Sequence, residues 1–312
     1  MTQKLTWVLA HEPYDLFLRA AEAFSKEVSE KTQGAFEIEV LGLSEYNAKY
    51  NEQVTDRYSL LDELESGEKI QLSQMYTTTL AQLSEDMYVL DLPFIFADHD
   101  HAARVLDGKI GQELFATLAE KSNVQGLAFT YSGGFRIVPT TEVVAHLEDL
   151  RGLRIRTGSP VAKDTFEAIG AEPVAMTIED LANGLAEGTV TAGESTYPRI
   201  YGMNQAEVAK GIIHTEHSLF LTSLIINKEL WNSLDTATQQ IFADAALSAA
   251  HIERKESIED IYVTQARAKE EGIRVVELSA DDVAKFKSAT APVTAKYAEK
   301  LSAGLVSRVQ NA

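Results

Sequence analysis

Residues 150–170 read LRGLRIRTGSPVAKDTFEAIG and predict a short strand that turns directly into a helix. Arg154 and Arg156 alternate with an apolar residue, so both arginines would share one face of the strand. Ser159 followed by Pro160 is typical of a helix N-cap and first turn. The stretch therefore predicts one β–α step of an α/β fold, with two arginines just before the helix begins.

The position of Arg156 favours an anion-binding site. It precedes a predicted helix N-terminus, where unpaired backbone N–H groups attract negative charge. A guanidinium beside such a terminus can hold both oxygens of a carboxylate, because its planar fork matches them. The alternative is that Arg151, Arg154 and Arg156 are solvated surface charges, and the local sequence leaves both interpretations open. Arg136, close behind a glycine pair, raises the same question with a weaker signal.

The rest of the chain alternates predicted strands and helices. Residues 4–10 and 35–40 read as strands around a helix with apolar residues at helical spacing, closed by Gly34. Residues 124–141 read as a strand, a glycine turn and a second strand. Residues 236–271 contain no proline or glycine and predict one helix of about 50 Å. Because that length exceeds one small domain, we expect the helix to cross between two α/β lobes.

The composition excludes several classes of protein. Among 312 residues, 47 are acidic and 28 basic, which gives a formal charge of -19. Nucleic-acid binding needs a basic surface, and so does attraction to anionic membranes. The absence of cysteine excludes disulfides and a catalytic thiol. No apolar run reaches the roughly 20 residues of a membrane span, so we expect no membrane insertion.

The first residues enter a strand-like pattern and lack the basic and apolar regions of a signal peptide. We therefore expect either a cytosolic protein or a mature form that carries an added Met.

Motifs of common enzymes and metal sites are missing. The sequence contains no GxSxG, Walker loop, GxGxxG or HExxH. DHDH at 98–101 and HTEH at 214–217 offer possible metal ligands, but neither has the spacing of a zinc motif, and DHDH fits an exposed helix start. We expect no metal, no cofactor and no catalytic residue. Two alternative functions remain. The chain could be an enzyme acting on a small carboxylate, which needs a nucleophile or a metal. It could also be the effector-binding part of a transcription regulator, which needs a basic DNA-binding module.

Five stretches, in their order along the chain, resemble the substrate-binding proteins of TRAP transporters. These are the periplasmic receptors of tripartite ATP-independent uptake systems. The resemblance spans essentially the full chain. Its strongest part is DLRGLRIRTGSPVAKDTFEAIGAEPVAMTIEDLANGLAEGTVTAGES at 149–195, and the other stretches lie at 23–40, 89–108, 130–141 and 214–234.

This resemblance implies a two-lobed, periplasmic-binding-protein-like α/β fold, each lobe a mixed sheet flanked by helices, with a long helix spanning both. Lobe I would contain residues 1–123 and 214–250, and lobe II residues 124–213 and 251–312. The implied function is a periplasmic receptor that binds a small organic acid in the cleft, closes on it and delivers it to the TRAP permease subunits. The receptor would be a monomer whose signal peptide is absent from this sequence.

The resemblance also implies the ligand-binding residues. Arg156 stands at the family's signature arginine and would form a bidentate pair with the ligand carboxylate, while Arg136 would support the same anion. Ser159 and Ser195 replace asparagines of some relatives, and Ile178 replaces an aromatic residue. These changes point away from a nine-carbon sugar acid and toward a smaller or more apolar carboxylate. The predicted set is Arg156, Arg136, Ser159, Ser195, Tyr76, Thr77, His11, Tyr14, Glu194 and Tyr197.

Overall fold

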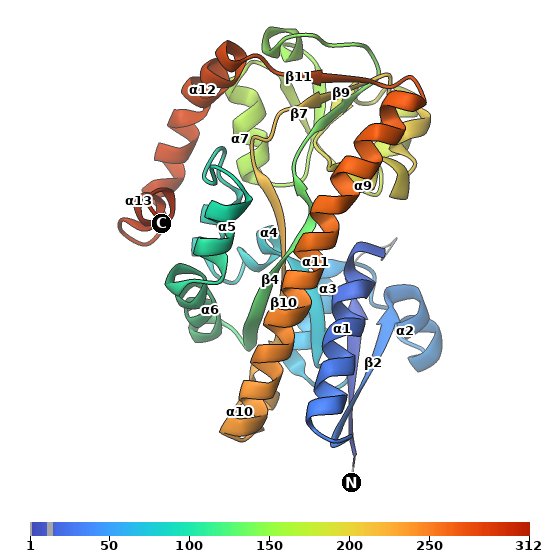
Figure 1. The fold of residues 1–312 in the computed structure, drawn as a ribbon, viewed down its shortest axis with the longest axis vertical. Coiled ribbons are helices and arrows are strands. Elements are labelled where there is room, and N and C mark those ends of the chain that lie inside the picture. The colour runs from blue at the N-terminus through green and yellow to red at the C-terminus, as the bar shows by residue number, and fades with distance from the viewer. Residues whose placement is uncertain (1, 11–14) are drawn as a thin grey trace.

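The computed structural model describes residues 2–10 and 15–312, which form two α/β lobes beside one long helix (Figure 1). The first lobe is built on a five-stranded mixed sheet with the order β2-β1-β3-β10-β4. β1 runs parallel to β2 and β3, whereas β10 runs antiparallel to β3 and β4. The strands are β1 (Gln3–Leu9), β2 (Phe36–Gly42), β3 (Leu72–Tyr76), β4 (Val124–Phe135) and β10 (Leu219–Asn227).

The second lobe is built on a six-stranded mixed sheet with the order β11-β9-β5-β8-β6-β7. β6 lies between β8 and β7 and runs parallel to both, as expected for strands joined by helical crossovers. The strands are β5 (Val138–Thr140), β6 (Arg154–Thr157), β7 (Glu172–Ala175), β8 (Ala192–Gly193), β9 (Gly211–His214) and β11 (Arg274–Glu277).

Helices cover both sheets. The predicted β-α-β unit at the N-terminus is present, because α1 packs against β2 between two parallel strands. The predicted helix after Ser159 is also present as α7, with the Ser159 side chain accepting a hydrogen bond from Ala162 N at 3.1 Å. The α-helices other than the long one are α1 (Asp15–Lys31), α2 (Leu43–Tyr50), α3 (Arg57–Ser66), α4 (Thr77–Leu80), α5 (His99–Leu106), α6 (Lys109–Lys121), α7 (Pro160–Ala168), α8 (Leu181–Glu187), α9 (Tyr197–Gly202), α10 (Lys228–Ser233), α12 (Ala280–Ala298) and α13 (Leu305–Gln310). Three short 3-10 helices are η1 (Glu85–Asp91), η2 (Leu147–Leu150) and η3 (Gln205–Glu207).

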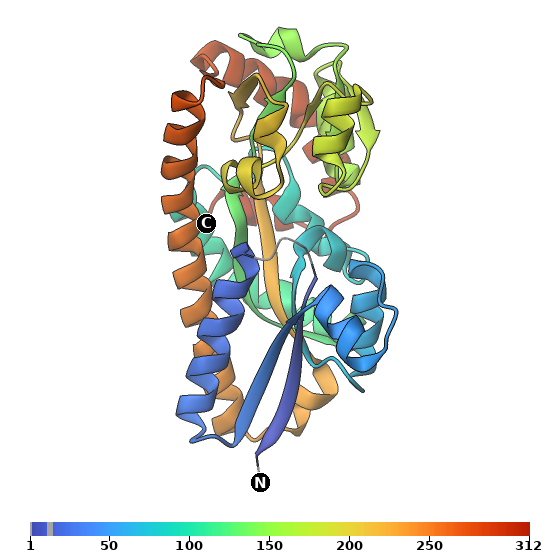
Figure 2. The same cartoon turned by 90° about the vertical axis from the view of Figure 1, so that its right-hand side faces the viewer.

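The long helix α11 (Thr236–Glu270) has 35 residues and confirms the prediction made for this segment. Asp235 caps its N-terminus by accepting a hydrogen bond from Thr238 N at 2.7 Å. α11 contacts α1 and β4 in the first lobe and α9 and β11 in the second. Figure 2 shows it running along one side of both lobes. None of the described helices combines the length and apolar character that crossing a bilayer requires.

Two backbone segments pass between the sheets, one from β4 to β5 and one from β9 to β10. The register of β4 against β10 shifts next to Gly133 and Gly134, whose φ values of 90° and 87° are readily adopted only by glycine, and β4 ends one residue later at Phe135. The predicted lobe boundaries remain a prediction. However, the pairing of β4 with β10 along its whole length favours moving the boundary at residue 124 to a point after Phe135.

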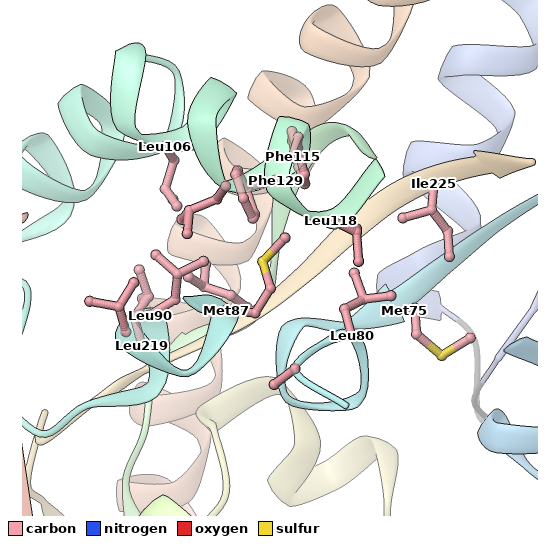
Figure 3. Packing of buried hydrophobic residues seen from close by; sticks show 14 of the residues in the cluster. Met75, Leu80, Met87, Leu90, Leu106, Phe115, Leu118, Phe129, Leu219 and Ile225 are labelled. Carbon is pink, nitrogen blue, oxygen red and sulfur yellow. The ribbon is translucent and has the colours of Figure 1, made fainter. Parts of the chain in front are cut away.

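The apolar core of the first lobe packs η1, α5 and α6 against β4 and β10 (Figure 3). Phe115 of α6 stacks on Phe129 of β4 with ring centroids 4.0 Å apart. Gly126 makes this contact possible, because a Cβ atom there would lie 2.0 Å from the Phe115 ring. This packing fixes η1, and therefore Asp91 at its end, relative to the sheet that forms one wall of the cleft.

Candidate ligand-binding site

A cavity of about 20 Å³, enough for one water molecule, lies where the two lobes meet. The first lobe contributes Arg57, Tyr76 and Phe220, and the second contributes Arg156 and Ile178. No acidic side chain is among its described lining residues, which are Arg57, Tyr76, Thr78, Arg136, Arg156, Gly158, Ser159, Ile178 and Phe220. The wall of the cavity is therefore cationic and aromatic.

Arg156 reaches the cavity from the end of β6 and is only 4% exposed. Its Nε donates to the carbonyl oxygen of Met176 at 2.9 Å, and its Nη1 donates to the carbonyl oxygen of Glu194 at 3.3 Å. Nη2 lies against Gly158, where a Cβ atom would come within 2.7 Å. Burial lowers the pKa of Arg156 to about 10, although the nearby Glu194 charge opposes this effect. The guanidinium is thus desolvated, with neutral carbonyl groups as its hydrogen-bond partners.

Arg136 is buried to the same degree but is held by two carboxylates. Its Nη1 donates to Glu194 Oε1 at 3.0 Å and its Nη2 donates to Asp91 Oδ1 at 2.8 Å. The guanidinium carbon also lies 3.9 Å from the centre of the Phe220 ring. Arg136 is therefore neutralised by the protein itself.

Glu194, at the end of β8, is fully buried between the two arginines. Burial alone would raise the pKa of Glu194, but the charge of Arg136, the neighbouring His217 and the charge of Arg156 together outweigh it and lower the pKa to about 2. For Asp91 the balance is reversed, and burial raises its pKa despite the charge of Arg136. Glu194 Oε2 lacks a hydrogen-bond partner among the described residues, as does His217 Nε2, which lies 3.7 Å away.

The arrangement agrees with the relatives of this chain. A model of bacterial extracellular solute-binding proteins, family 7, matches residues 10–301. The chain belongs to this family. It is 27% identical to the C4-dicarboxylate-binding periplasmic protein DctP of Rhodobacter capsulatus, over 90% of this chain and 86% of that protein.

Two solved structures of TRAP periplasmic solute-binding proteins are similar to this receptor over nearly its whole length. The protein from Citrobacter koseri, with bound D-glucuronate, is 27% identical with a TM-score of 0.86 and full coverage of both chains. The protein from Polaromonas sp. JS666, bound to D-erythronate, is 27% identical with a TM-score of 0.87, covering 99% of this chain and 98% of that one. These similarities confirm the predicted two-lobed fold and the prediction of an extracytoplasmic solute receptor that is not an enzyme.

The receptor brings several predicted ligand-binding residues to the cavity. Tyr76 and Ser159 line it together with the two arginines, and Glu194 lies directly behind them. Ser195 is buried, and its hydroxyl has no hydrogen-bond partner among the described residues. Their contact with a ligand stays a prediction.

The remaining predicted residues lie elsewhere or outside the described part of the chain. Thr77 follows Tyr76 but its hydroxyl donates to the carbonyl oxygen of Leu221 at 3.4 Å. Tyr197 packs in an apolar cluster of the second lobe and is not among the lining residues. His11 and Tyr14 lie outside the described residues. Ligand contacts for all four stay predictions.

The candidate metal ligands behave as ordinary side chains. Asp98 caps α5 by accepting a hydrogen bond from His101 N at 2.7 Å, which confirms the predicted helix start. His214 forms ion-pair contacts with Glu216 and Glu277. Within residues 2–10 and 15–312, no cluster of three or more histidine or acidic side chains is placed to hold a metal ion.

The sequence analysis missed four residues that shape the cavity: Arg57, Asp91, His217 and Phe220. Arg57 is the first residue of α3, and its buried Nε has no hydrogen-bond partner among the described residues. Asp56 before it is a helix N-cap that could have been recognised, but nothing local indicates that α3 points at the cleft. Asp91 reaches the site from η1, Phe220 from β10 and His217 from the segment between β9 and β10, all far away in the sequence.

Proposed function

We propose that this protein is the periplasmic receptor of a TRAP uptake system and that it binds a small organic acid through a carboxylate–Arg156 pair. The observation that carries the proposal is that this guanidinium is fully buried, yet its hydrogen-bond partners among the described residues are neutral carbonyl groups. Its carboxylate neighbour Glu194 lies 3.9 Å away and is hydrogen-bonded to Arg136 instead. Burying an incompletely paired charge is costly, and a ligand carboxylate at hydrogen-bond distance would supply a direct partner. No hydrogen bond joins Nη2 of Arg156 to another described residue, so this nitrogen can donate to a ligand oxygen.

Closure of the two lobes follows from the same contacts. The cavity walls come from both lobes, so a ligand touches both only when they are closed. A ligand shifts a conformational equilibrium by its differential affinity for the two states, and the pair with Arg156 is strongest when water is excluded. Acid binding and closure would therefore be coupled, and the closed receptor, acting as a monomer, would deliver the acid to the membrane subunits of a TRAP permease.

The ligand class is a short hydroxy or keto acid. Relatives of similar sequence contain D-glucuronate and D-erythronate, which carry a carboxylate and several hydroxyl groups. The apolar side chains of Ile178 and Phe220 on the cavity wall favour an acid at the short end of this range. Hydrogen-bonding groups at its rim are the hydroxyls of Tyr76, Thr78 and Ser159.

A thermal-shift screen of organic acids tests the proposal, with wild-type protein, Arg156→Ala and Arg154→Ala. Arg154 lies two residues earlier on β6 and is exposed, so it is a matched control for the loss of one positive charge. An acid present at a hundred times its Kd adds about 2.7 kcal/mol of apparent stability. We expect this gain in the wild type and Arg154→Ala and its absence in Arg156→Ala. Equal binding by Arg156→Ala and the wild type would rule out the carboxylate pair.

A further inference from the structure

A second buried arginine, Arg199 on α9, has no acidic partner. It is 3% exposed, and no carboxylate among the described residues lies within ion-pair distance. Its Nη2 donates to Ser132 Oγ at 2.7 Å and to Tyr76 Oη at 2.8 Å, and among the described residues the hydrogen-bond partner of its Nη1 is Met203 Sδ, at 3.0 Å. A thioether sulfur is a weak acceptor. The charge of Arg199 is therefore compensated only by neutral groups.

Other buried arginines of the receptor are compensated differently. Arg136 has Asp91 and Glu194, and Arg254 has Asp107 at 2.9 Å. Around Arg199 the compensation comes from the aromatic rings of Phe17, Tyr76 and Phe220, whose centres lie 5.6, 5.7 and 5.3 Å from the guanidinium carbon. Cation–π contacts offset only part of the cost of burying a full charge. An anion bound beside Arg199 would supply the remainder.

The structure has room for such an anion in a hollow of about 380 Å³ next to Arg199. α1 of the first lobe and α9 of the second form its walls, and α11 runs behind both. The described lining residues are Asp15, Leu16, Arg19, Pro198, Arg199, Gly202, Met203, Asp260 and Thr264. None of them is among the described lining residues of the cavity at Arg156, and Tyr76, which accepts a hydrogen bond from Arg199, lies between the two.

Arg19 provides a second donor in the same hollow. Its Nη1 and Nη2 are paired with Glu256 at 3.1 Å and Asp260 at 2.7 Å, so its single positive charge is shared between these two carboxylates. Its Nε, by contrast, is buried without a hydrogen-bond partner among the described residues. Two guanidinium groups from opposite lobes thus retain N–H donors that the protein does not fully use.

We propose that this hollow is a second anion-binding site that takes a small oxyanion, with Arg199 as its main ligand and Arg19 Nε as a further donor. Carboxylate, phosphate and sulfate groups share the required chemistry, because each presents oxygen acceptors to a planar guanidinium. A bound oxyanion would touch both lobes at once. The site lies outside the cleft that holds the organic acid.

Titration calorimetry with inorganic phosphate at low ionic strength tests this site in Arg156→Ala protein, where the carboxylate pair of the cleft has been removed. We expect saturable binding of one phosphate per chain. Adding Arg199→Met should weaken that binding at least tenfold, whereas adding Arg154→Met, which removes an exposed arginine, should leave it unchanged. A parallel titration with acetate distinguishes a preference for phosphate from general oxyanion binding, and saturable, Arg199-dependent binding of either ion supports the site.

Gly202 provides a test that leaves both arginines in place. A Cβ atom at this position would meet no atom within 4 Å, and its φ lies outside the left-handed region, so larger residues fit. In the Arg156→Ala background, Gly202→Glu should abolish phosphate binding by placing a competing carboxylate in the hollow, and Gly202→Ala should retain it. Absence of saturable binding in Arg156→Ala, or binding that survives both Arg199→Met and Gly202→Glu, would overturn the proposal.

Discussion

Arg136 and Arg156 are two arginines with nearly equal burial and opposite surroundings. Arg136 is bonded to two carboxylates from distant segments, whereas Arg156 is bonded to two backbone carbonyls. The first arrangement is complete without a ligand, whereas the second has no carboxylate at hydrogen-bond distance, because Glu194 lies 3.9 Å from Arg156 and is bonded to Arg136. Burial alone therefore does not identify a ligand-binding arginine. The deciding feature is whether the protein already provides carboxylates that hydrogen-bond to the buried guanidinium. We assign Arg136 to the stability of the site and Arg156 to recognition of the acid.

The largest expected effect comes from replacing the neutralised arginine. Arg136→Met would leave Asp91 buried without its cation and Glu194 with only Arg156, 3.9 Å away, and breaking a buried ion pair typically costs 3–5 kcal/mol of unfolding free energy. Arg156→Met should cost much less, because it removes a buried charge that lacks a carboxylate partner at hydrogen-bond distance. Urea denaturation at pH 7 measures both. If Arg156→Met were destabilised as much as Arg136→Met, the division of roles between the two arginines would be wrong.

The pH dependence of stability gives the next largest effect and tests the Arg136–Glu194 pair directly. The pKa of Glu194 is lowered from 4.5 to about 2 in the folded protein, so the folded state favours the charged form. The contribution of Glu194 to the free energy of unfolding is fully present above pH 4.5 and is lost as the pH falls from 4.5 to about 2. This contribution is about 3 kcal/mol in full.

Glu194→Gln isolates this contribution, because Asp91, with its raised pKa, has a pH dependence of the opposite sign. We expect the difference in unfolding free energy between the wild type and Glu194→Gln to be large at pH 5 and to shrink steadily toward pH 2. Urea denaturation at several pH values provides the measurement. A difference that does not change between pH 5 and pH 2 would show that Glu194 is not a charged partner of Arg136.

Sequence patterns predicted the parts of this receptor that depend on local signals. The strand with Arg156, the N-cap at Ser159 and the 35-residue helix α11 were all readable from spacing and capping residues. The partners of Arg136 were not, because Asp91 and Glu194 lie 45 and 58 residues away along the chain. Such contacts depend on how sheets and helices pack, and no local pattern encodes them.

The lobe boundary predicted at residue 124 also depends on long-range strand pairing, which no local pattern indicates. Residues 124–141 read as one strand–turn–strand unit, yet β4 pairs with β10 in the first sheet and β5 with β8 and β9 in the second. The glycine pair Gly133 and Gly134 was recognised as a turn, but it lies inside β4 at a register shift against β10, and the chain changes sheets only after Phe135. Arg199 was missed for a related reason, since its lack of a carboxylate becomes visible only once its surroundings are known.

The smallest expected effect concerns Ser159, which joins the two lobes through one hydroxyl. Its Oγ accepts from Ala162 N as the N-cap of α7 and donates to Asp91 Oδ2 at 2.6 Å, and Asp91 in turn holds Arg136. Ser279 is a matched control, because it caps α12 by accepting from Asp282 N at 3.1 Å and also donates to that aspartate.

Ser159→Ala and Ser279→Ala should each lose about 1 kcal/mol of unfolding free energy. Only Ser159→Ala should also weaken binding of the organic acid found in the screen, by about fivefold in calorimetry, since a lost hydrogen bond at the cavity is worth about 1 kcal/mol. Equal affinities of the two variants for the acid would mean that Ser159 stabilises the helix but does not bind the ligand. The prediction from the family resemblance that Ser159 is a ligand-binding residue would then be wrong.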